Sequence, residues 1–178
     1  MKKNLLIRIA LIWLVMAAVL TGNVFAEQTN GELILKLKED IIRIQNQGEL
    51  GIKKLNLCRS VVALGAYVPL EEAKIEVGKE YYIYYEPANV FTKISEGRYE
   101  FWFTQDILLL DDTGEVLMER LGALSMHFNT ATPLLDIYVT NDLLLTGFPP
   151  GKYTYKIVLR DVFKDESVVE AIDFEVVE

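Results

Sequence analysis

A strand with strict two-residue periodicity, preceded by a Pro-Pro-Gly turn, is the most restrictive feature of this sequence. Residues 152–161 read Lys-Tyr-Thr-Tyr-Lys-Ile-Val-Leu-Arg-Asp, so an aromatic or aliphatic side chain stands at every second position. Successive side chains of a β-strand point to opposite faces, and one face of this segment is therefore apolar. A second layer, supplied by the rest of the chain, must cover that face. The apolar face consists of Tyr153, Tyr155, Ile157 and Leu159.

Residues 51–178 contain a series of such strands, separated by turn residues. No helical pattern connects them, whereas a parallel sheet would need crossover helices. The region therefore predicts one all-β domain, an antiparallel immunoglobulin-like two-sheet sandwich of seven or eight strands, with a closed barrel as the alternative. Breaks are expected at residues 65–69 and 87–89, and residues 121–133 fit no pattern. The expected strands are residues 52–62, 79–86, 98–110, 115–120, 134–141 and 152–161, and a last strand that contains Ile172, Phe174 and Val176.

The first 26 residues have the pattern of a signal peptide. An apolar run over residues 9–20 follows three basic residues, Lys2, Lys3 and Arg8. Val-Phe-Ala at residues 24–26 then predicts a cleavage site after Ala26. The run is shorter than the roughly 20 residues that span a membrane, so an uncleaved anchor is the less favoured alternative. We expect a periplasmic or secreted protein, associated with the membrane only if this segment stays uncleaved.

Residues 27–50 form a polar linker with a helical pattern in its second half. Leu33, Leu37, Ile41 and Ile44 recur at helical spacing within residues 31–47. The alternative is a strand that runs through Leu33, Leu35 and Leu37, followed by a loop; the helix is the preferred interpretation.

Composition excludes several classes of function. The signal segment holds three of the 18 basic residues and none of the 26 acidic residues, so its removal leaves a net charge of −11, which disfavours nucleic acid as a partner. Cys58 is the only cysteine, so no intramolecular disulfide can form. One cysteine and one histidine, His127, are too few for a zinc site, and their separation in sequence disfavours a Cys–His catalytic pair.

The carboxylates form no recognisable catalytic or metal-binding set. Asp111, Asp112 and Glu115 could offer oxygens to calcium, but Asp-Asp-Thr-Gly at 111–114 is good turn chemistry and is interpreted as a hairpin turn. The sequence also lacks a nucleophile elbow, a phosphate loop and a dinucleotide fingerprint. We therefore expect no enzyme activity, no metal and no cofactor.

Aromatic residues are more numerous on the predicted strands than one core needs. Tyr81, Tyr82, Tyr84 and Tyr85 place rings on both faces of one strand. Because only one face of a sandwich strand points into the core, the other rings are either exposed or covered by something else. The candidate binding surface comprises Tyr82, Tyr84, Trp102 and Tyr138.

Two resemblances support the fold prediction. Residues 145–153, Leu-Thr-Gly-Phe-Pro-Pro-Gly-Lys-Tyr, resemble the start of the sixth strand in immunoglobulin-like and fibronectin type III-like domains. The resemblance implies that Tyr153 enters the core and bonds its hydroxyl to upstream backbone. The segments 57–61, 65–69, 78–86, 112–114 and 150–153 resemble a group of exported bacterial β-sandwich proteins of unknown function, over residues 52–178. That resemblance implies no catalytic or binding residues.

The function expected from the sequence is a non-catalytic interaction module that binds a protein in the cell envelope. The alternative is a carbohydrate-binding module that uses Trp102 and the face of Tyr82 and Tyr84. Solvent exposure separates the two hypotheses. A flat row of exposed rings favours a glycan, whereas an apolar patch beside an uncapped edge strand favours a protein.

Overall fold

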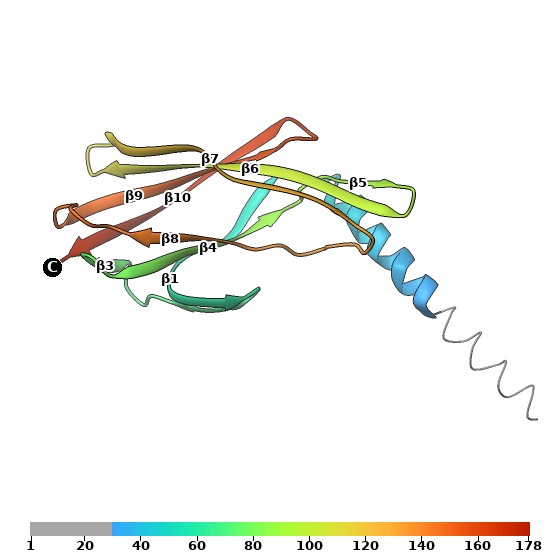
Figure 1. Cartoon of the computed structure of the whole chain (residues 1–178), viewed down its shortest axis with the longest axis horizontal. Coiled ribbons are helices and arrows are strands. Elements are labelled where there is room, and N and C mark those ends of the chain that lie inside the picture. The colour runs from blue at the N-terminus through green and yellow to red at the C-terminus, as the bar shows by residue number, and fades with distance from the viewer. Residues whose placement is uncertain (1–29) are drawn as a thin grey trace, which may run out of the picture. The chain divides into compact units, whose positions relative to one another are not determined.

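The computed structural model describes residues 30–178 (Figure 1). The predicted signal peptide, residues 1–26, lies outside the described residues. Within residues 30–178, no helix is both long enough and apolar enough to cross a membrane. The chain divides after Ile41 into two units, and the second unit, Ile42–Glu178, contains all the strands described below.

Residues 30–45 are helical, which confirms the helix expected over residues 31–47 and rules out the strand alternative. The last turn of this helix belongs to the second unit, where Ile42 is buried. Asn46 follows the helix, and its side chain donates to the Thr92 carbonyl at 2.9 Å and accepts from the Thr92 N–H at 2.8 Å. The structural boundary therefore lies at 41/42, within the segment that the sequence assigned to the linker.

The second unit is an all-β structure of two sheets, as predicted. All strand pairs are antiparallel except β3–β10, which is parallel. Residues 30–178 form ten strands, more than the seven or eight expected, and they lie in two separate sheets instead of a closed barrel. The four-stranded sheet has the order β2 (Ala66–Pro69), β1 (Gly51–Ala63), β4 (Glu80–Ala88) and β8 (Val139–Leu144). The six-stranded sheet has the order β3 (Lys74–Glu76), β10 (Glu166–Val177), β9 (Gly151–Asp161), β6 (Arg98–Asp111) and β5 (Thr92–Ser95), with β7 (Val116–Thr130) also paired with β6.

Two expected breaks proved to be strand. Residues 66–69 form the second strand of a hairpin with β1, and β4 continues through Pro87 to Ala88. β8 pairs with β4 only as far as Tyr85, so one side of β4 is an edge at Pro87. A proline is tolerated there because its missing N–H costs no ladder hydrogen bond.

The core lies between the sheets and is built by the faces that alternation predicted. Tyr155, Ile157 and Leu159 of β9 are buried, as are Phe103 and Leu109 of β6. Each of these strands presents its alternate residues to the other side of the sheet, in agreement with the two-residue period.

One polar side chain, Gln105 of β6, lies within this apolar core with 0% of its surface exposed. Its Oε1 accepts from the Tyr85 hydroxyl, and its Nε2 donates to Asn141 Oδ1 at 3.0 Å. Burial raises the pKa of Tyr85, so the hydroxyl remains a donor. The cluster links β4, β6 and β8 across the two sheets without leaving a buried polar atom unpaired.

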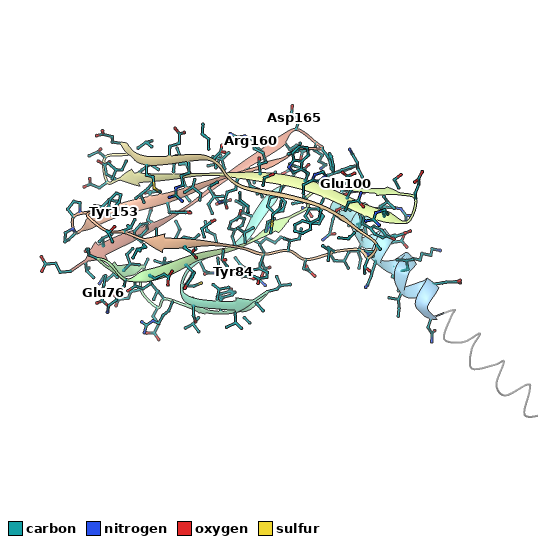
Figure 2. All side chains as sticks on the ribbon, viewed as in Figure 1. Glu76, Tyr84, Glu100, Tyr153, Arg160 and Asp165 are labelled. Carbon is teal, nitrogen blue, oxygen red and sulfur yellow. The ribbon has the colours of Figure 1, made fainter. Side chains whose placement is uncertain are left out.

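Tyr153 forms the corner expected at the start of β9. Its hydroxyl donates to the Pro149 carbonyl at 2.7 Å, and its ring stacks against Phe174 with centroids 5.9 Å apart (Figure 2). The side chain is buried, and its hydrogen bond fixes the path of the Pro-Pro-Gly turn.

Removing this hydroxyl is expected to lower the free energy of unfolding by about 1 kcal/mol, the usual net value of one such hydrogen bond. The variant Tyr153→Phe keeps the ring contacts, and urea denaturation with an unchanged slope would isolate the loss of the bond. Tyr138→Phe, at a partly exposed tyrosine, is the matched control and should change stability by less than about 0.5 kcal/mol. Equal effects of the two substitutions would contradict this role for Tyr153.

Candidate functional site

The longest edge of the structure is β7, the fifteen-residue strand at the margin of the six-stranded sheet (Figure 1). Among residues 30–178, the strand ladders pair β7 with β6 alone. An unpaired edge presents backbone N–H and C=O groups that can accept another strand. Apolar residues of β7 are exposed as well: Val116, Leu117, Leu121 and Phe128.

A bulge divides β7 into two arms. Residues 116–120 form the N-terminal arm, which pairs with β6 from Leu110 to Ile107, and residues 124–130 form the C-terminal arm, which pairs from Gln105 to Tyr99. The bulge comprises residues 121–123, and its Gly122 has a φ of +61°, a conformation that favours glycine. Leu121, within the bulge, is 71% exposed.

Asp106 of β6 holds this bulge in place. Its Oδ1 accepts from the Gly122 N–H at 2.7 Å, and its Oδ2 accepts from the Arg160 guanidinium of β9 (Figure 2 labels Arg160). Burial alone would raise the pKa of this carboxyl, but the Gly122 and Arg160 bonds outweigh burial and lower it. Asp106 therefore stays charged and connects three neighbouring strands.

The outward side chains of the C-terminal arm lean towards β6. Ser125 Oγ accepts from Trp102 Nε1 at 3.0 Å. The His127 ring stacks on Trp102 with centroids 4.8 Å apart, and a 2.7 Å hydrogen bond joins its Nε2 to Glu100 Oε1. These contacts hold the two side chains over the sheet, on the side of β7 where β6 lies. They therefore do not cover the free edge of the strand.

The inward side chains of the same arm extend the core to the edge of the sheet. Leu124 and Met126 are partly buried against the core cluster. The Phe128 ring lies 5.4 Å from that of Phe101, yet 43% of Phe128 remains exposed. The arm therefore has an apolar face that its own fold covers only in part. In the sequence, this face corresponds to apolar residues at even positions of β7, a pattern that Arg120 and Gly122 interrupt.

The structure does not bring the four predicted surface residues together. Trp102 lies on the outward side of the six-stranded sheet, where it contacts His127 and the edge of Phe163. Tyr82 and Tyr84 belong to β4 of the other sheet, and Tyr138 precedes β8 of that sheet. Trp102 is therefore separate from the three tyrosines.

Tyr84 is covered instead of exposed. Its ring lies between Tyr67 and Tyr138, with centroid distances of 4.2 and 5.8 Å, and 0% of its surface is exposed (Figure 2). Burial and the hydrogen bond to Glu86 raise the pKa of Tyr84 to about 12. The rings pack face against face, so they do not form the flat exposed row that favours a glycan. Tyr82 and Tyr138 are partly exposed on this sheet.

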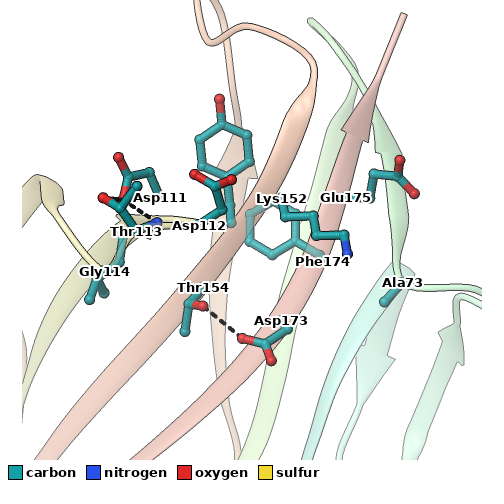
Figure 3. A pocket seen from close by; sticks show the side chains of 12 residues that line it. Ala73, Asp111, Asp112, Thr113, Gly114, Lys152, Thr154, Asp173, Phe174 and Glu175 are labelled. Atoms are coloured by element: carbon teal, nitrogen blue, oxygen red, sulfur yellow. Dashed lines mark hydrogen bonds between the residues drawn. The ribbon is translucent and has the colours of Figure 1, made fainter.

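A cleft of about 660 Å³ lies at one end of the sandwich, beside the hairpin turn at residues 111–114 (Figure 3). Asp111 confirms the turn interpretation, because its Oδ1 accepts from the N–H groups of Thr113 and Glu115, both at 2.9 Å. The Thr113 hydroxyl also donates to this oxygen, at 2.7 Å. The hydroxyl bond, followed by the backbone bonds, lowers the pKa of Asp111. Asp173 accepts from Thr154 at 2.7 Å. Two of the carboxylates in the cleft are thus already occupied by local hydrogen bonds.

Among residues 30–178, no group of three or more potential ligands is placed to hold a metal ion. Cys58 is buried in β1 of the four-stranded sheet, and burial raises the pKa of its thiol. His127 lies on β7 of the other sheet. The two residues therefore do not form a nucleophile–base pair.

Comparisons with known proteins leave the function open. No family model and no curated protein matches the chain. The alkylpurine DNA glycosylase AlkC of Pseudomonas fluorescens, bound to DNA containing an abasic site analog, is 12% identical with a TM-score of 0.42, over 74% of this chain and 31% of that chain. A family 123 glycoside hydrolase from Clostridium perfringens is 9% identical with a TM-score of 0.42, over 74% and 28%.

A Niemann-Pick type C2 protein from the Japanese carpenter ant is 12% identical with a TM-score of 0.33, over 72% of this chain and 88% of that chain. The chain spans less than a third of the glycosylase and of the hydrolase. At TM-scores this low, none of these similarities supports an argument about activity.

Proposed function

We propose that this chain is a non-catalytic, exported interaction module that binds a protein in the cell envelope through the edge of β7. The observation that carries the proposal is the combination of an unpaired strand edge with apolar side chains that remain exposed along it. Partners that add a strand to such an edge gain backbone hydrogen bonds, and alternate side chains supply specificity. The partly covered face of Leu124, Met126 and Phe128 would then pack against the partner.

Carbohydrate binding has less support. Glycan platforms expose ring faces, whereas Tyr84 is enclosed by two other tyrosines and Trp102 has His127 stacked on it. A titration of Trp102 fluorescence with cell-wall and plant polysaccharides tests this alternative. Saturable quenching, abolished by Trp102→Phe, would favour the glycan hypothesis over the protein hypothesis.

The protein hypothesis is tested by site-specific photo-crosslinking in the envelope of the producing cell. A photoreactive amino acid at Leu121 or Ser125 of β7 is expected to capture a discrete protein adduct. The same group at Lys156 of β9, a strand paired on both sides at this residue, is the matched control and should give no adduct. Absence of an adduct at both β7 positions, or the same adduct at all three positions, would overturn the proposal.

A further inference from the structure

We infer that the partner of β7 is a second copy of this chain, bound antiparallel through the C-terminal arm so that two six-stranded sheets become one continuous sheet. The inference deepens the proposed function and rests on it, because it names the molecule that occupies the same edge. Residues 124–130 have three properties that favour such pairing: an unprotected edge, no Asp, Glu, Lys or Arg, and a side-chain pattern that is complementary to itself.

The C-terminal arm lacks the usual features that prevent edge pairing. Natural edges are protected by proline, lysine, inward-pointing charges or bulges. The N-terminal arm carries two charged residues, Glu119 and Arg120. The C-terminal arm reads Leu-Ser-Met-His-Phe-Asn-Thr, with no proline, lysine, arginine or carboxylate. The two arms of one strand therefore differ, and only the C-terminal arm is left open.

Side chains that could shield the open edge are held elsewhere. Ser125 and His127 bond to Trp102 and Glu100 of β6. The Asn129 side chain likewise accepts from Arg98 Nε of β6. The backbone carbonyl of Asn129 accepts from Nη2 of the same guanidinium at 2.7 Å. All three outward side chains of the arm are thus engaged with β6, so a docking strand would not have to displace them.

The pattern of the arm is complementary to itself. When two copies pair antiparallel about a two-fold axis through His127, each of the seven residues of one arm lies opposite a residue of the other arm. Residues at even positions then lie opposite residues at even positions of the second copy. Met126 then lies opposite Phe128 of the second copy, and Leu124 lies opposite Thr130, on the inward face. Ser125 lies opposite Asn129 on the outward face. Apolar side chains meet mainly apolar ones, and polar side chains meet polar ones.

A neutral contact also suits two acidic molecules. Each copy carries a net charge of −8 over the whole chain, so identical copies repel at long range. The C-terminal arm adds no carboxylate to the interface, and Arg98 and Glu100 beneath it carry opposite charges. A contact at the turn of residues 111–114 would instead bring Asp111 and Asp112 of the two copies together.

Disulfide trapping tests the proposed axis directly. In His127→Cys the two cysteines of the dimer would face each other, with Cα atoms about 4.5–5.5 Å apart, a distance that a disulfide spans. We expect rapid formation of a covalent dimer under mild oxidation. Leu117→Cys, also exposed on β7 but outside the arm, is the matched control and should form no covalent dimer, although its non-covalent dimer is retained. The native Cys58 is buried and contributes no background.

Sedimentation equilibrium of the chain, purified as its host produces it, measures dimerisation without a cross-link. Met126→Lys places a charge on the inward face of the arm and is expected to weaken the dimer more than about tenfold. Leu117→Lys should leave it unchanged. Circular dichroism of both variants establishes that each is folded.

The inference is overturned if the wild-type chain is monomeric at every concentration, or if His127→Cys and Leu117→Cys cross-link at equal rates. Its failure is distinguishable from that of the proposed function. A monomer that still forms an adduct with a different protein at Leu121 or Ser125 overturns the dimer and leaves the interaction module in place. Loss of both results overturns both.

Discussion

Replacing Asp161 with alanine is expected to lower the free energy of unfolding by about 3 kcal/mol, because three backbone N–H groups lose their acceptor together. Asp161 ends β9, and only 1% of its surface is exposed. Its Oδ1 accepts from Phe163 and Lys164 at 2.9 and 3.1 Å, and its Oδ2 accepts from Phe91 at 2.6 Å. One carboxylate thus closes the β9–β10 turn and ties it to the segment before β5.

Asp161→Asn is the matched control, since it keeps the shape and one acceptor oxygen. We expect it to cost about half as much as the alanine variant. Urea denaturation gives both values, and Trp102 fluorescence provides a local readout because Phe163 packs edge-on against Trp102. If alanine and asparagine destabilise the protein equally, the loss of the charge, and not of the acceptors, is responsible. A change below about 0.5 kcal/mol for the alanine variant would contradict the role assigned to Asp161.

The regular parts of the fold were predictable from sequence because the local pattern and the tertiary environment agree. β9 alternates without interruption, its predicted face is buried, and the Tyr153 hydroxyl reaches the Pro149 carbonyl as the corner motif implied. The structure of such segments can be predicted from the sequence because local propensity and global packing favour the same conformation. The helix over residues 30–45 was predictable for the same reason, from the spacing of its apolar residues.

The strand expected over residues 115–120 is confirmed as the N-terminal arm of β7, but the rest of β7 was not predictable because its irregularity is stabilised from elsewhere in the chain. The bulge at residues 121–123 depends on Asp106 and Arg160, which lie on other strands. Gly122 therefore appears in the sequence as a strand breaker, and it separates the alternation of Leu124, Met126 and Phe128 from the strand before it. Bulges near sheet edges are common, but their partner residues have no fixed spacing in the sequence.

The four residues of the candidate binding surface do not lie together in the structure, and their arrangement also depends on segments distant in sequence. Alternation correctly placed Tyr84 on the face of β4 opposite the core residue Tyr85. It could not show that Tyr67, from the β1–β2 hairpin, and Tyr138, from the segment before β8, close over the ring. Exposure of an outward residue depends on loops and hairpins that are distant in sequence. β7 is an edge strand because only one of its sides is paired, and this can be recognised only once the strand order is known.

Asp106 gives the second large effect, about 2 kcal/mol for Asp106→Ala, because the substitution leaves the Gly122 N–H and the Arg160 guanidinium without their shared acceptor. Arg160 is partly solvated, so the cost is smaller than for Asp161. Asp106→Asn is nearly isosteric and isolates the contribution of the charge. Both variants should be folded at neutral pH, which makes the comparison by urea denaturation possible.

The same carboxyl predicts how stability depends on pH. Its folded-state pKa lies below the ordinary value of 3.8, so the folded protein binds this proton less readily than the unfolded chain does. The stabilisation is therefore fully present above the ordinary pKa and is lost as pH falls through the lowered one. Denaturation measured from neutral pH into the acid range should show the wild-type advantage over Asp106→Asn shrinking below about pH 4. A constant difference across that range would show that Asp106 acts through its shape and hydrogen-bond geometry and not through its charge.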